Sequence, residues 1–320
     1  MHTIEELRIL FIDYLKQESF ETEPQNLYAP NNYFLQIGGK RLRPILLLLA
    51  AELFEGDIDT ALPAALSIEY FHNFTLIHDD VMDQAPTRRG FQTIHEKYNL
   101  NTAILSGDVL LVKAYEILGR LPSAKFQEIF KIYTKTAIEV CEGQQYDIDF
   151  ERKELVSHAE YIEMIRLKTS VLLAASMQIG ALLGNASDEE AKLIYTYAEN
   201  LGIAFQIQDD ILDCYGDETL VGKQPGGDII QNKKTLLMIE ALKHNDERLT
   251  HLMIETTIQP SEKINGVLAI YDEFKIKEFA TKQRDYYVNN SLSVLDKIKL
   301  TASKRDILKS LVEHLVVRNF

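Results

Sequence analysis

The sequence predicts an all-α protein, and three observations support this fold class. Apolar residues recur at helical spacing through most of the chain, beginning with the stretch at about residues 4–15. Val, Ile and Thr show no sustained alternation with a period of two, so no stretch has the pattern of a strand. No low-complexity or linker-like segment divides the chain. We therefore expect one all-α domain that spans residues 1–320.

Prolines and glycines mark the ends of the first helices. The amphipathic opening helix at 4–15 should be interrupted by Pro24 and Pro30, because proline cannot donate a backbone hydrogen bond. A second short helix should end at Gly38 and Gly39, since glycine is typical of helix C-termini.

The third and fourth helices have equally clear boundaries. Pro44 is well placed in the first turn of a strongly apolar helix that should run through Leu53. Gly56 and Asp57 indicate a turn. A long helix should follow it and continue to about residue 83.

The rest of the chain reads as helices separated by two loops. The first loop, at 84–90, is rich in Pro, Gly and Arg, and the second, at 216–228, contains several glycines. Between them we expect helices at about 102–118, 124–150, 158–183 and 188–215. About four more should follow the second loop, with one ending near Asn245 and the last near Val317.

Composition excludes several classes of protein. The chain of 320 residues is 46% hydrophobic, enough for a sizeable core, and its net charge of -14 argues against a nucleic-acid binder. Cys141 and Cys214 form neither a disulfide framework nor a zinc motif, so we expect both in or near the core. The sequence shows no signal-peptide pattern and no apolar run near the roughly 20 residues that span a bilayer. We expect a soluble, cytoplasmic protein without a membrane span.

One acidic motif occurs twice, as HDDVMD at 78–83 and as QDDILD at 208–213. Because a helix turns by about 100° per residue, each copy points three carboxylates from about one turn. Apolar residues surround both copies, and ionised carboxylates in such surroundings need a cation. Oxygen ligands without a nearby cysteine suit Mg²⁺, which often completes its shell with a substrate phosphate. The candidate ligands are Asp79, Asp80, Asp83, Asp209, Asp210 and Asp213.

Basic residues follow each acidic motif. Arg88 and Arg89 come after the first copy, and Lys223, Lys233 and Lys234 come after the second. The stretch 38–44, which reads GGKRLRP, adds three more cations beside a predicted helix start. Arginine suits fork-like recognition of phosphate and lysine suits a point-charge contact. Two acidic motifs with several cations indicate a site for more than one diphosphate.

Five stretches together resemble one enzyme family. GGKRLRP, FTLIHDDVMD with RRG, RLKTSVLL, FQIQDDILD, and GKQPGGDI with NKKT occur in order between Gly38 and Thr235. They are similar to the trans-isoprenyl diphosphate synthases (polyprenyl synthetases) of short-chain type, which make geranylgeranyl or farnesyl diphosphate. The resemblance implies a single large bundle of antiparallel helices around a deep cavity, usually in a homodimer.

The resemblance also implies a reaction. Isopentenyl diphosphate would condense head to tail with an allylic diphosphate such as dimethylallyl, geranyl or farnesyl diphosphate. Three Mg²⁺ held between the acidic motifs would help the allylic C–O bond to ionise. The isopentenyl double bond would then attack the carbocation, and loss of a proton would restore an alkene.

The resemblance assigns roles to the polar residues. The isopentenyl diphosphate site would comprise Lys40, Arg43, His72 and Arg89. The allylic diphosphate would be bound by Arg88, Lys168, Lys223 and Lys233. Thr169 and Gln206, beside the catalytic Lys168, would steady positive charge. Asp79, Asp83 and Asp209 would bind metal, while Asp80, Asp210 and Asp213 would act directly or through water.

Other polar residues in these motifs have structural interpretations. We interpret His78 as a packing or supporting residue. Arg41 and Lys234 should point outward, because one helix turn cannot direct every basic side chain to the same side. His72 alone would more often be a buried histidine with a hydrogen-bond partner, but its position seven residues before Asp79 favours a role in the site.

The residues that precede the first acidic motif bear on product length. Phe74 and Phe71 lie five and eight residues before Asp79, one and two turns deeper along a cavity that would hold the growing tail. An aromatic residue at the position of Phe74 resembles the short-chain enzymes of the family, and Thr75 departs from the paired aromatics of many eukaryotic farnesyl synthases. The resemblance therefore favours a C20 product, geranylgeranyl diphosphate, over C15 farnesyl diphosphate. The two extra residues that bacterial farnesyl synthases carry inside the first motif are absent.

Three alternatives explain less of the sequence. A terpene cyclase shares the ionisation chemistry, but it has no need for a second diphosphate site at Lys40, Arg43 and His72. An HD-type phosphohydrolase built on His72 and the pair His78-Asp79 would leave the second acidic motif unexplained. A non-catalytic regulatory subunit is disfavoured because no acidic position has been lost.

Overall fold

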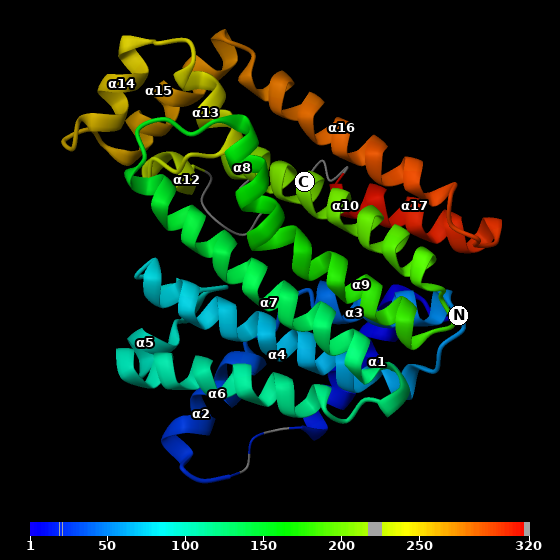
Figure 1. The fold of residues 1–320 in the computed structure, drawn as a ribbon. Coiled ribbons are helices and arrows are strands. Elements are labelled where there is room, and N and C mark those ends of the chain that lie inside the picture. The colour runs from blue at the N-terminus through cyan, green and yellow to red at the C-terminus, as the bar shows by residue number, and fades with distance from the viewer. Residues whose placement is uncertain (19, 21, 217–225, 317–320) are drawn as a thin grey trace. The chain divides into compact units, whose positions relative to one another are not determined.

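The structure is a computed structural model that describes residues 1–18, 20, 22–216 and 226–316. Within them the chain is almost entirely helical, which confirms the predicted all-α class (Figure 1). In chain order the elements are α1 (Ile4–Gln17), α2 (Gln25–Gln36), α3 (Leu42–Leu53), α4 (Ile58–Met82), β1 (Thr87–Arg88), β2 (Phe91–Gln92), α5 (Ile94–Lys97), α6 (Leu100–Leu118), α7 (Ser123–Arg152), α8 (His158–Ile165), the π-helical turn η1 (Arg166–Ser170), α9 (Val171–Leu183), α10 (Asp188–Tyr215), α12 (Gly227–Ile230), α13 (Leu236–Leu242), α14 (Glu247–Ile254), α15 (Pro260–Glu273), α16 (Ile276–Leu295) and α17 (Ala302–Val316).

The predicted helices are present, with four differences. Pro30 lies inside α2 and does not interrupt a helix. The loop expected at 84–90 contains the start of a small antiparallel hairpin, in which Arg88 pairs with Phe91. The helix expected at 158–183 is divided by the π turn. Six described helices, not four, follow the second loop, because several of them are short.

The chain forms two compact units. The N-terminal unit comprises Met1–Thr134 and Ala175–Lys192, and the C-terminal unit comprises Lys135–Ala174 and the chain from Leu193 onward. Each unit has its own core, so each is described by itself. That residues 1–320 act as a single domain stays a prediction.

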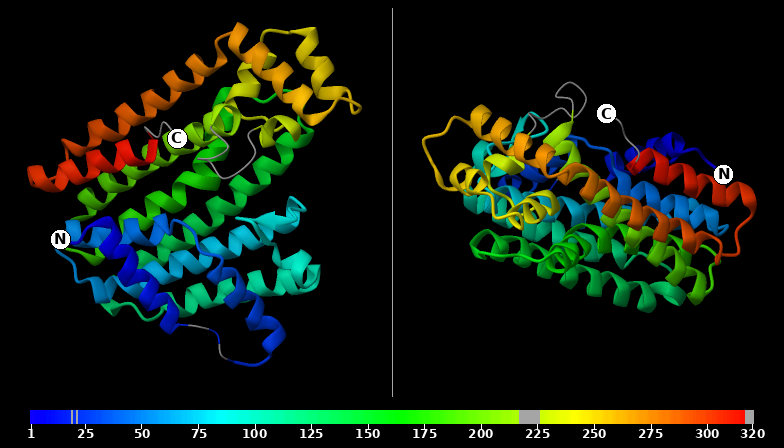
Figure 2. Two further views of the ribbon diagram at one scale, coloured as in Figure 1. Left: turned by 180° about the vertical axis from the view of Figure 1, so that it is seen from behind. Right: turned by 90° about the horizontal axis from the view of Figure 1, so that it is seen from above.

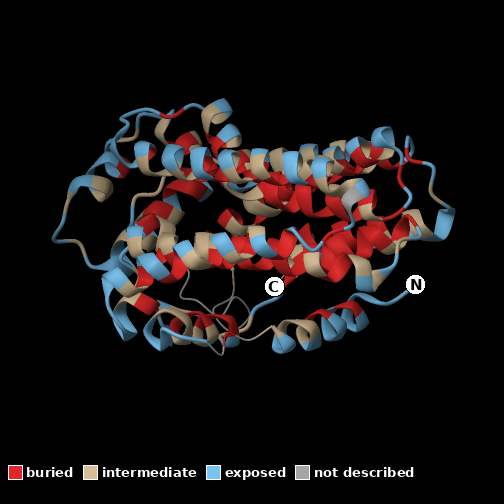
Figure 3. Cartoon of the chain, turned by 60° about the horizontal axis from the view of Figure 1, so that its bottom comes forward, coloured by how far each residue is buried: buried red, intermediate tan, exposed pale blue. Residues whose placement is uncertain are grey.

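In the N-terminal unit, α4 packs against α3 and α6. The run 45–51 of α3 is wholly buried, as its apolar sequence predicts, and Figure 3 marks the buried residues in red. The side chain of Asp57 accepts a hydrogen bond from the backbone N–H of Thr60 and thereby caps α4. This helix carries the first acidic motif at its C-terminal end, so its packing fixes where those carboxylates lie.

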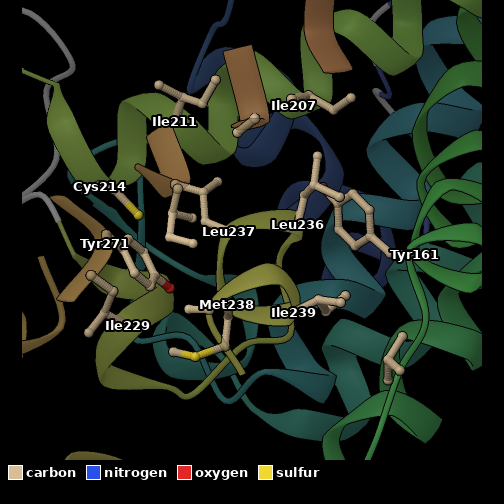
Figure 4. Packing of buried hydrophobic residues seen from close by; sticks show 14 of the residues in the cluster. Tyr161, Ile207, Ile211, Cys214, Ile229, Leu236, Leu237, Met238, Ile239 and Tyr271 are labelled. Atoms are coloured by element: carbon tan, nitrogen blue, oxygen red, sulfur yellow. The ribbon is translucent and has the colours of Figure 1, made fainter. Parts of the chain in front are cut away.

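In the C-terminal unit, buried side chains from α8, α10, α12, α13 and α15 form one hydrophobic cluster (Figure 4). Its members include Tyr161 of α8 and Ile207 of α10, while α16 and α17 pack against each other further along the chain (Figure 2). Cys214 lies in this cluster, but Cys141 is exposed, so our expectation of two core thiols is wrong for Cys141. Among the described residues, none of the helices combines the length and apolar character needed to cross a membrane.

Candidate active site

The first acidic turn closes α4 in the N-terminal unit. Asp79 is partly exposed and Asp83, the C-cap residue, is exposed, whereas Asp80 is buried. Both carboxylate oxygens of Asp80 accept hydrogen bonds from Nε of Arg88, each at 2.9 Å. Burial raises the pKa of Asp80, and its contacts with Arg88 oppose this rise. The middle aspartate of the motif is therefore engaged by the basic loop that follows it.

Four of the predicted diphosphate-binding residues lie close together in this unit. Nη1 of Arg43 is 3.1 Å from Nε2 of His72, and Arg89 donates a hydrogen bond to the carbonyl of Gly38. The backbone of Gly39 has a φ of 135°, which favours glycine, and a Cβ there would meet the guanidinium of Arg89. Lys40 is exposed on the same loop, next to this cluster in sequence.

The cationic surroundings keep His72 uncharged. Burial, together with Arg43 and Arg89, lowers the pKa of His72 well below its usual value of 6.5. Because a guanidinium can only donate, Nε2 of His72 must accept from Arg43, which places the ring proton on Nδ1. His72 thus orients Arg43 and adds no charge of its own.

The side chain of Arg41 points inward, contrary to our expectation. We expected its side chain to point outward, but it is buried and forms an ion pair with Glu69 of α4. It also donates to the carbonyl of Leu35, while Asn73 donates to Glu69 at 2.8 Å. The cause is the left-handed backbone of Arg41, with φ of 50°, which precedes α3 and directs the side chain inward. Arg41 therefore anchors the loop that carries Lys40.

The residues predicted to limit product length lie along α4. Phe71 is buried, and its ring centroid lies 5.6 Å from that of Phe74. Phe74 is partly exposed and contacts the ring of His78 edge to face at 4.8 Å. The hydroxyl of Thr75 donates to the carbonyl of His72, so it is held against its own helix.

His78 has the packing role that we predicted for it. Its Nε2 lies 3.1 Å from the backbone carbonyl of Ile104 on α6, and its ring contacts Phe74. His72, in contrast, is bound to Arg43. The two histidines therefore have different partners, and this geometry does not favour the phosphohydrolase alternative.

The second acidic turn lies in α10 of the C-terminal unit. Asp209 and Asp213 are partly exposed, and Asp210 is buried. The hydroxyl of Tyr161 donates to one oxygen of Asp210, and Nε2 of Gln206 donates to the other at 3.0 Å. Burial and the nearby charge of Asp228 raise the pKa of Asp210 to about 8. This middle aspartate, like Asp80, is held by protein groups, but they are neutral.

Lys168 and Thr169 lie on the π turn η1, which sequence patterning did not reveal. Nζ of Lys168 is 2.5 Å from Oδ2 of Asp147 on α7, and the hydroxyl of Thr169 donates to Oε1 of Gln206 at 3.1 Å. We had not assigned Asp147 to the site. The signal that could have found it is Gly143, a glycine within a long helix and one turn before Asp147.

The lysines after the second motif are placed differently from one another. Lys223 lies outside the described residues. Lys233 is partly exposed, and its Nζ is 3.8 Å from Oδ1 of Asp228. Lys234 donates to the carbonyl of Phe150 at 2.8 Å, and partial burial lowers its pKa, so our expectation that it points outward is wrong.

Neither acidic turn forms a metal-binding cluster by itself. Across residues 1–18, 20, 22–216 and 226–316, no group of three or more His, Cys, Asp or Glu side chains converges closely enough to hold a metal ion. Asp213 accepts a hydrogen bond at 3.0 Å from the backbone N–H of Asp228, so the turn is braced by the segment that follows it. The donors of both turns are carboxylate oxygens, which is the chemistry that Mg²⁺ prefers.

An all-helical chain with two acidic turns and clustered cations has the features of an enzyme that handles diphosphate esters. The family model for polyprenyl synthetases matches residues 24–274. The chain belongs to the polyprenyl synthetase family and is a prenyltransferase.

Named relatives cover most of the chain. It is 37% identical to a geranylgeranyl diphosphate synthase of Methanosarcina mazei over 93% of this chain and 92% of the relative. It is 35% identical to a geranylfarnesyl diphosphate synthase of Natronomonas pharaonis, with coverage of 93% and 92%. A crystal structure of a geranylgeranyl pyrophosphate synthase matches all of both chains with a TM-score of 0.94 and 39% identity.

Proposed function

We propose that this chain condenses isopentenyl diphosphate with an allylic diphosphate and makes geranylgeranyl diphosphate. The observation that carries the proposal is the pair of acidic turns, each accompanied by ordered basic side chains, in a member of the polyprenyl synthetase family. The two turns would act on one pair of substrates, each turn with its own set of cations.

The cluster in the N-terminal unit suits the diphosphate of isopentenyl diphosphate. Arg43 is oriented by neutral His72, and Arg89 is held against the glycine loop that also carries Lys40. Preorganised cations bind a phosphate without the entropy cost of ordering flexible side chains. His72 can use its Nδ1 proton as a further donor.

Two of the cations assigned to the allylic diphosphate are braced by a carboxylate. Arg88 contacts Asp80, and Lys168 contacts Asp147. The carboxylates fix the direction of these long side chains, so a diphosphate can add to contacts that are already ordered. Lys233 and Lys223 would complete this group.

Asp79, Asp83, Asp209 and Asp213 fit Mg²⁺ because they supply only oxygen donors and are less buried than the middle aspartates. As the family resemblance implies, both turns and the substrate phosphates would bind the metals. Bound Mg²⁺ would supply Lewis-acid stabilisation of the leaving diphosphate. Asp80 and Asp210 would support the turns, either as ligands through water or through their protein partners.

The π turn and α10 would stabilise the allylic cation. The hydroxyl of Thr169 is bound to Gln206, so an oxygen lone pair of Thr169 remains to face positive charge. Fixed dipoles of this kind stabilise charge as it develops, because they need little reorganisation. Once the isopentenyl double bond has attacked, the departing diphosphate would accept the proton.

The C20 product is supported by the size of the side chains along α4 and by the names of relatives. Phe74 is partly exposed and its ring contacts that of buried Phe71, so these two large side chains could stop a growing tail. A C15 product is the alternative. One relative is named as a geranylfarnesyl diphosphate synthase, so similar sequences also occur in enzymes with a longer prenyl product.

A homodimer is supported by apolar side chains that α6 leaves exposed. They are Leu100, Ile104, Leu105 and Val112, which are between 40% and 64% exposed. Phe130 of α7, also 40% exposed, contacts Tyr115 of α6 edge to face. Several exposed apolar side chains on one helix favour a two-fold contact between copies of the chain. Light scattering should give a dimer mass, and Leu105→Glu should give monomers.

One incubation tests the proposed activity. Purified protein, Mg²⁺ and labelled isopentenyl diphosphate are supplied with dimethylallyl, geranyl or farnesyl diphosphate, and products are sized by reversed-phase chromatography. We expect a C20 product, which Asp79→Ala and Asp209→Ala should abolish. Asp13→Ala, an exposed aspartate paired with Lys16, is the control. Absence of any prenyl product from the wild-type chain would refute the proposal. The cytoplasmic location stays a prediction.

A further inference from the structure

A chain of hydrogen bonds connects α8, α10 and the π turn in the C-terminal unit. Tyr161 of α8 donates to Asp210, Gln206 donates to the other oxygen of Asp210 at 3.0 Å, and Thr169 donates to Gln206 at 3.1 Å. Tyr161 and Thr169 lie eight residues apart in sequence and are joined only through two side chains of α10. The chain thus begins in the hydrophobic cluster and ends at the residue proposed to face the allylic cation.

The acceptor at Asp210 fixes the direction of the whole chain. The amide nitrogen of Gln206 faces Asp210 and donates to its Oδ1. The amide oxygen of Gln206 then faces Thr169, whose hydroxyl proton must point to that oxygen. As a result, the lone pairs of the Thr169 hydroxyl are turned away from Gln206. If the Gln206 amide were flipped, its nitrogen would face Thr169. The hydroxyl proton of Thr169 would then have to point away from Gln206.

The backbone of the π turn is held from two sides. A Cβ at Gly143 of α7 would overlap the backbone nitrogen of Lys168, and a Cβ at Gly202 of α10 would lie 2.9 Å from Cα of Ser170. The turn therefore packs directly on the backbones of two helices. Single π turns within α-helices are frequent at functional sites. With the backbone fixed in this way, the remaining freedom at Thr169 is the direction of its hydroxyl.

The ring of Tyr161 packs in the hydrophobic cluster, and its hydroxyl is needed only for the hydrogen bond to Asp210. The residue is 2% exposed, and its ring belongs to the hydrophobic cluster, which a phenylalanine would fill equally well (Figure 4). Burial, reinforced by the charge of Asp210, raises the pKa of Tyr161 well above its usual value, so the hydroxyl stays a donor. A buried phenol beside a buried carboxylate is a specific arrangement, because each group would be destabilising without the other.

We propose that Tyr161 is a positioning residue of the condensation reaction. Through Asp210 it fixes the amide of Gln206, and through Gln206 it directs the Thr169 hydroxyl so that its oxygen faces the allylic cation. This inference rests on the proposed function. It adds a residue that contacts neither substrate and predicts coupling between two side chains that do not touch.

The test is a double-mutant cycle with Tyr161→Phe and Thr169→Val. Each single variant should lower kcat by about tenfold or more, since each removes one hydrogen bond to a charged or developing charged group. In the double variant, Tyr161→Phe should add less than about twofold to the effect of Thr169→Val, because both act through one chain. The KM for isopentenyl diphosphate should stay unchanged, since its residues lie in the N-terminal unit.

Tyr197→Phe is the matched control. Tyr197 is another fully buried tyrosine of this unit, and its hydroxyl donates to the carbonyl of Leu308 at 2.7 Å. Both Tyr→Phe variants should lower Tm by similar amounts, but only Tyr161→Phe should lower kcat. If Tyr161→Phe does not fold, Gln206→Leu breaks the same chain of hydrogen bonds one residue further on. Combined with Thr169→Val, Gln206→Leu should add less than about twofold to the loss of kcat.

Three results would overturn the inference. They are multiplicative effects of the two substitutions, an equal loss of kcat in Tyr197→Phe, and an unchanged kcat in Tyr161→Phe. A wild-type chain that forms no prenyl diphosphate would instead refute the proposed function. The two failures are therefore distinguishable in one set of assays.

Discussion

The buried ion pair between Arg41 and Glu69 allows a quantitative test of the N-terminal unit. The side chains are 4% and 3% exposed, and Asn73 is the other polar partner of Glu69. Arg41→Met would remove the cation and leave a buried carboxylate that only Asn73 satisfies. Breaking a buried pair in this way destabilises a protein by about 3–5 kcal/mol. We expect a loss of this size in urea unfolding followed by helical circular dichroism.

Two further variants make this test specific. Arg41→Met combined with Glu69→Met replaces both charges with apolar side chains, so it should be more stable than Arg41→Met alone. Arg120→Met removes a surface pair with Glu18, whose side chains are 43% and 26% exposed, and should lose at most about 1 kcal/mol. A loss in Arg41→Met no larger than in Arg120→Met, or a double variant less stable than Arg41→Met, would refute the reasoning.

Three other predictions follow from single side chains. Phe74→Ala should lengthen the product by at least one C5 unit because the tail gains room, and an unchanged product size on reversed-phase chromatography would count against it. Gly143→Ala should destabilise the protein by about 1–3 kcal/mol in urea unfolding, because its Cβ overlaps the backbone of Lys168. Since the folded protein lowers the pKa of His72, the unfolded chain binds more protons below pH 6.5, and stability should fall with acidification by up to about 1.4 kcal/mol per pH unit. His72→Gln, which keeps an acceptor for Arg43, should remove this component, and equal pH slopes in both proteins would contradict it.

The sequence predicts the helices well because their boundaries are local. Caps, prolines and glycines act within one turn, and α4 begins after Asp57 as its side chain dictates. The π turn could not be predicted in this way, because one extra residue in a helix barely changes the hydrophobic period over a short stretch. It forms where Gly143 and Gly202 admit close backbone contact, and that depends on residues far away in the sequence.

The sequence likewise predicts some features of the candidate site and not others. The motifs predict which residues take part, since spacing within one helix turn fixes which carboxylates lie together. They do not predict the conformation of the loop at Arg41, whose left-handed backbone turns the side chain inward to meet Glu69. Asp147 was missed because its partner Lys168 is 21 residues away in sequence, on a different element.

The two acidic motifs are repeats in sequence but not in electrostatics. In the first, the middle aspartate binds Arg88, a charged side chain from the loop that follows, so the carboxylate stays paired and orients a cation. In the second, the middle aspartate binds Tyr161 and Gln206, which are neutral, and it orients an amide. Burial and the nearby charge of Asp228 raise the pKa of Asp210 to about 8, and the hydrogen bonds from Tyr161 and Gln206 oppose this rise. The two motifs therefore differ in what their middle carboxylates orient, which is a cation in the N-terminal unit and an amide in the C-terminal unit. The residues that meet these carboxylates make the difference.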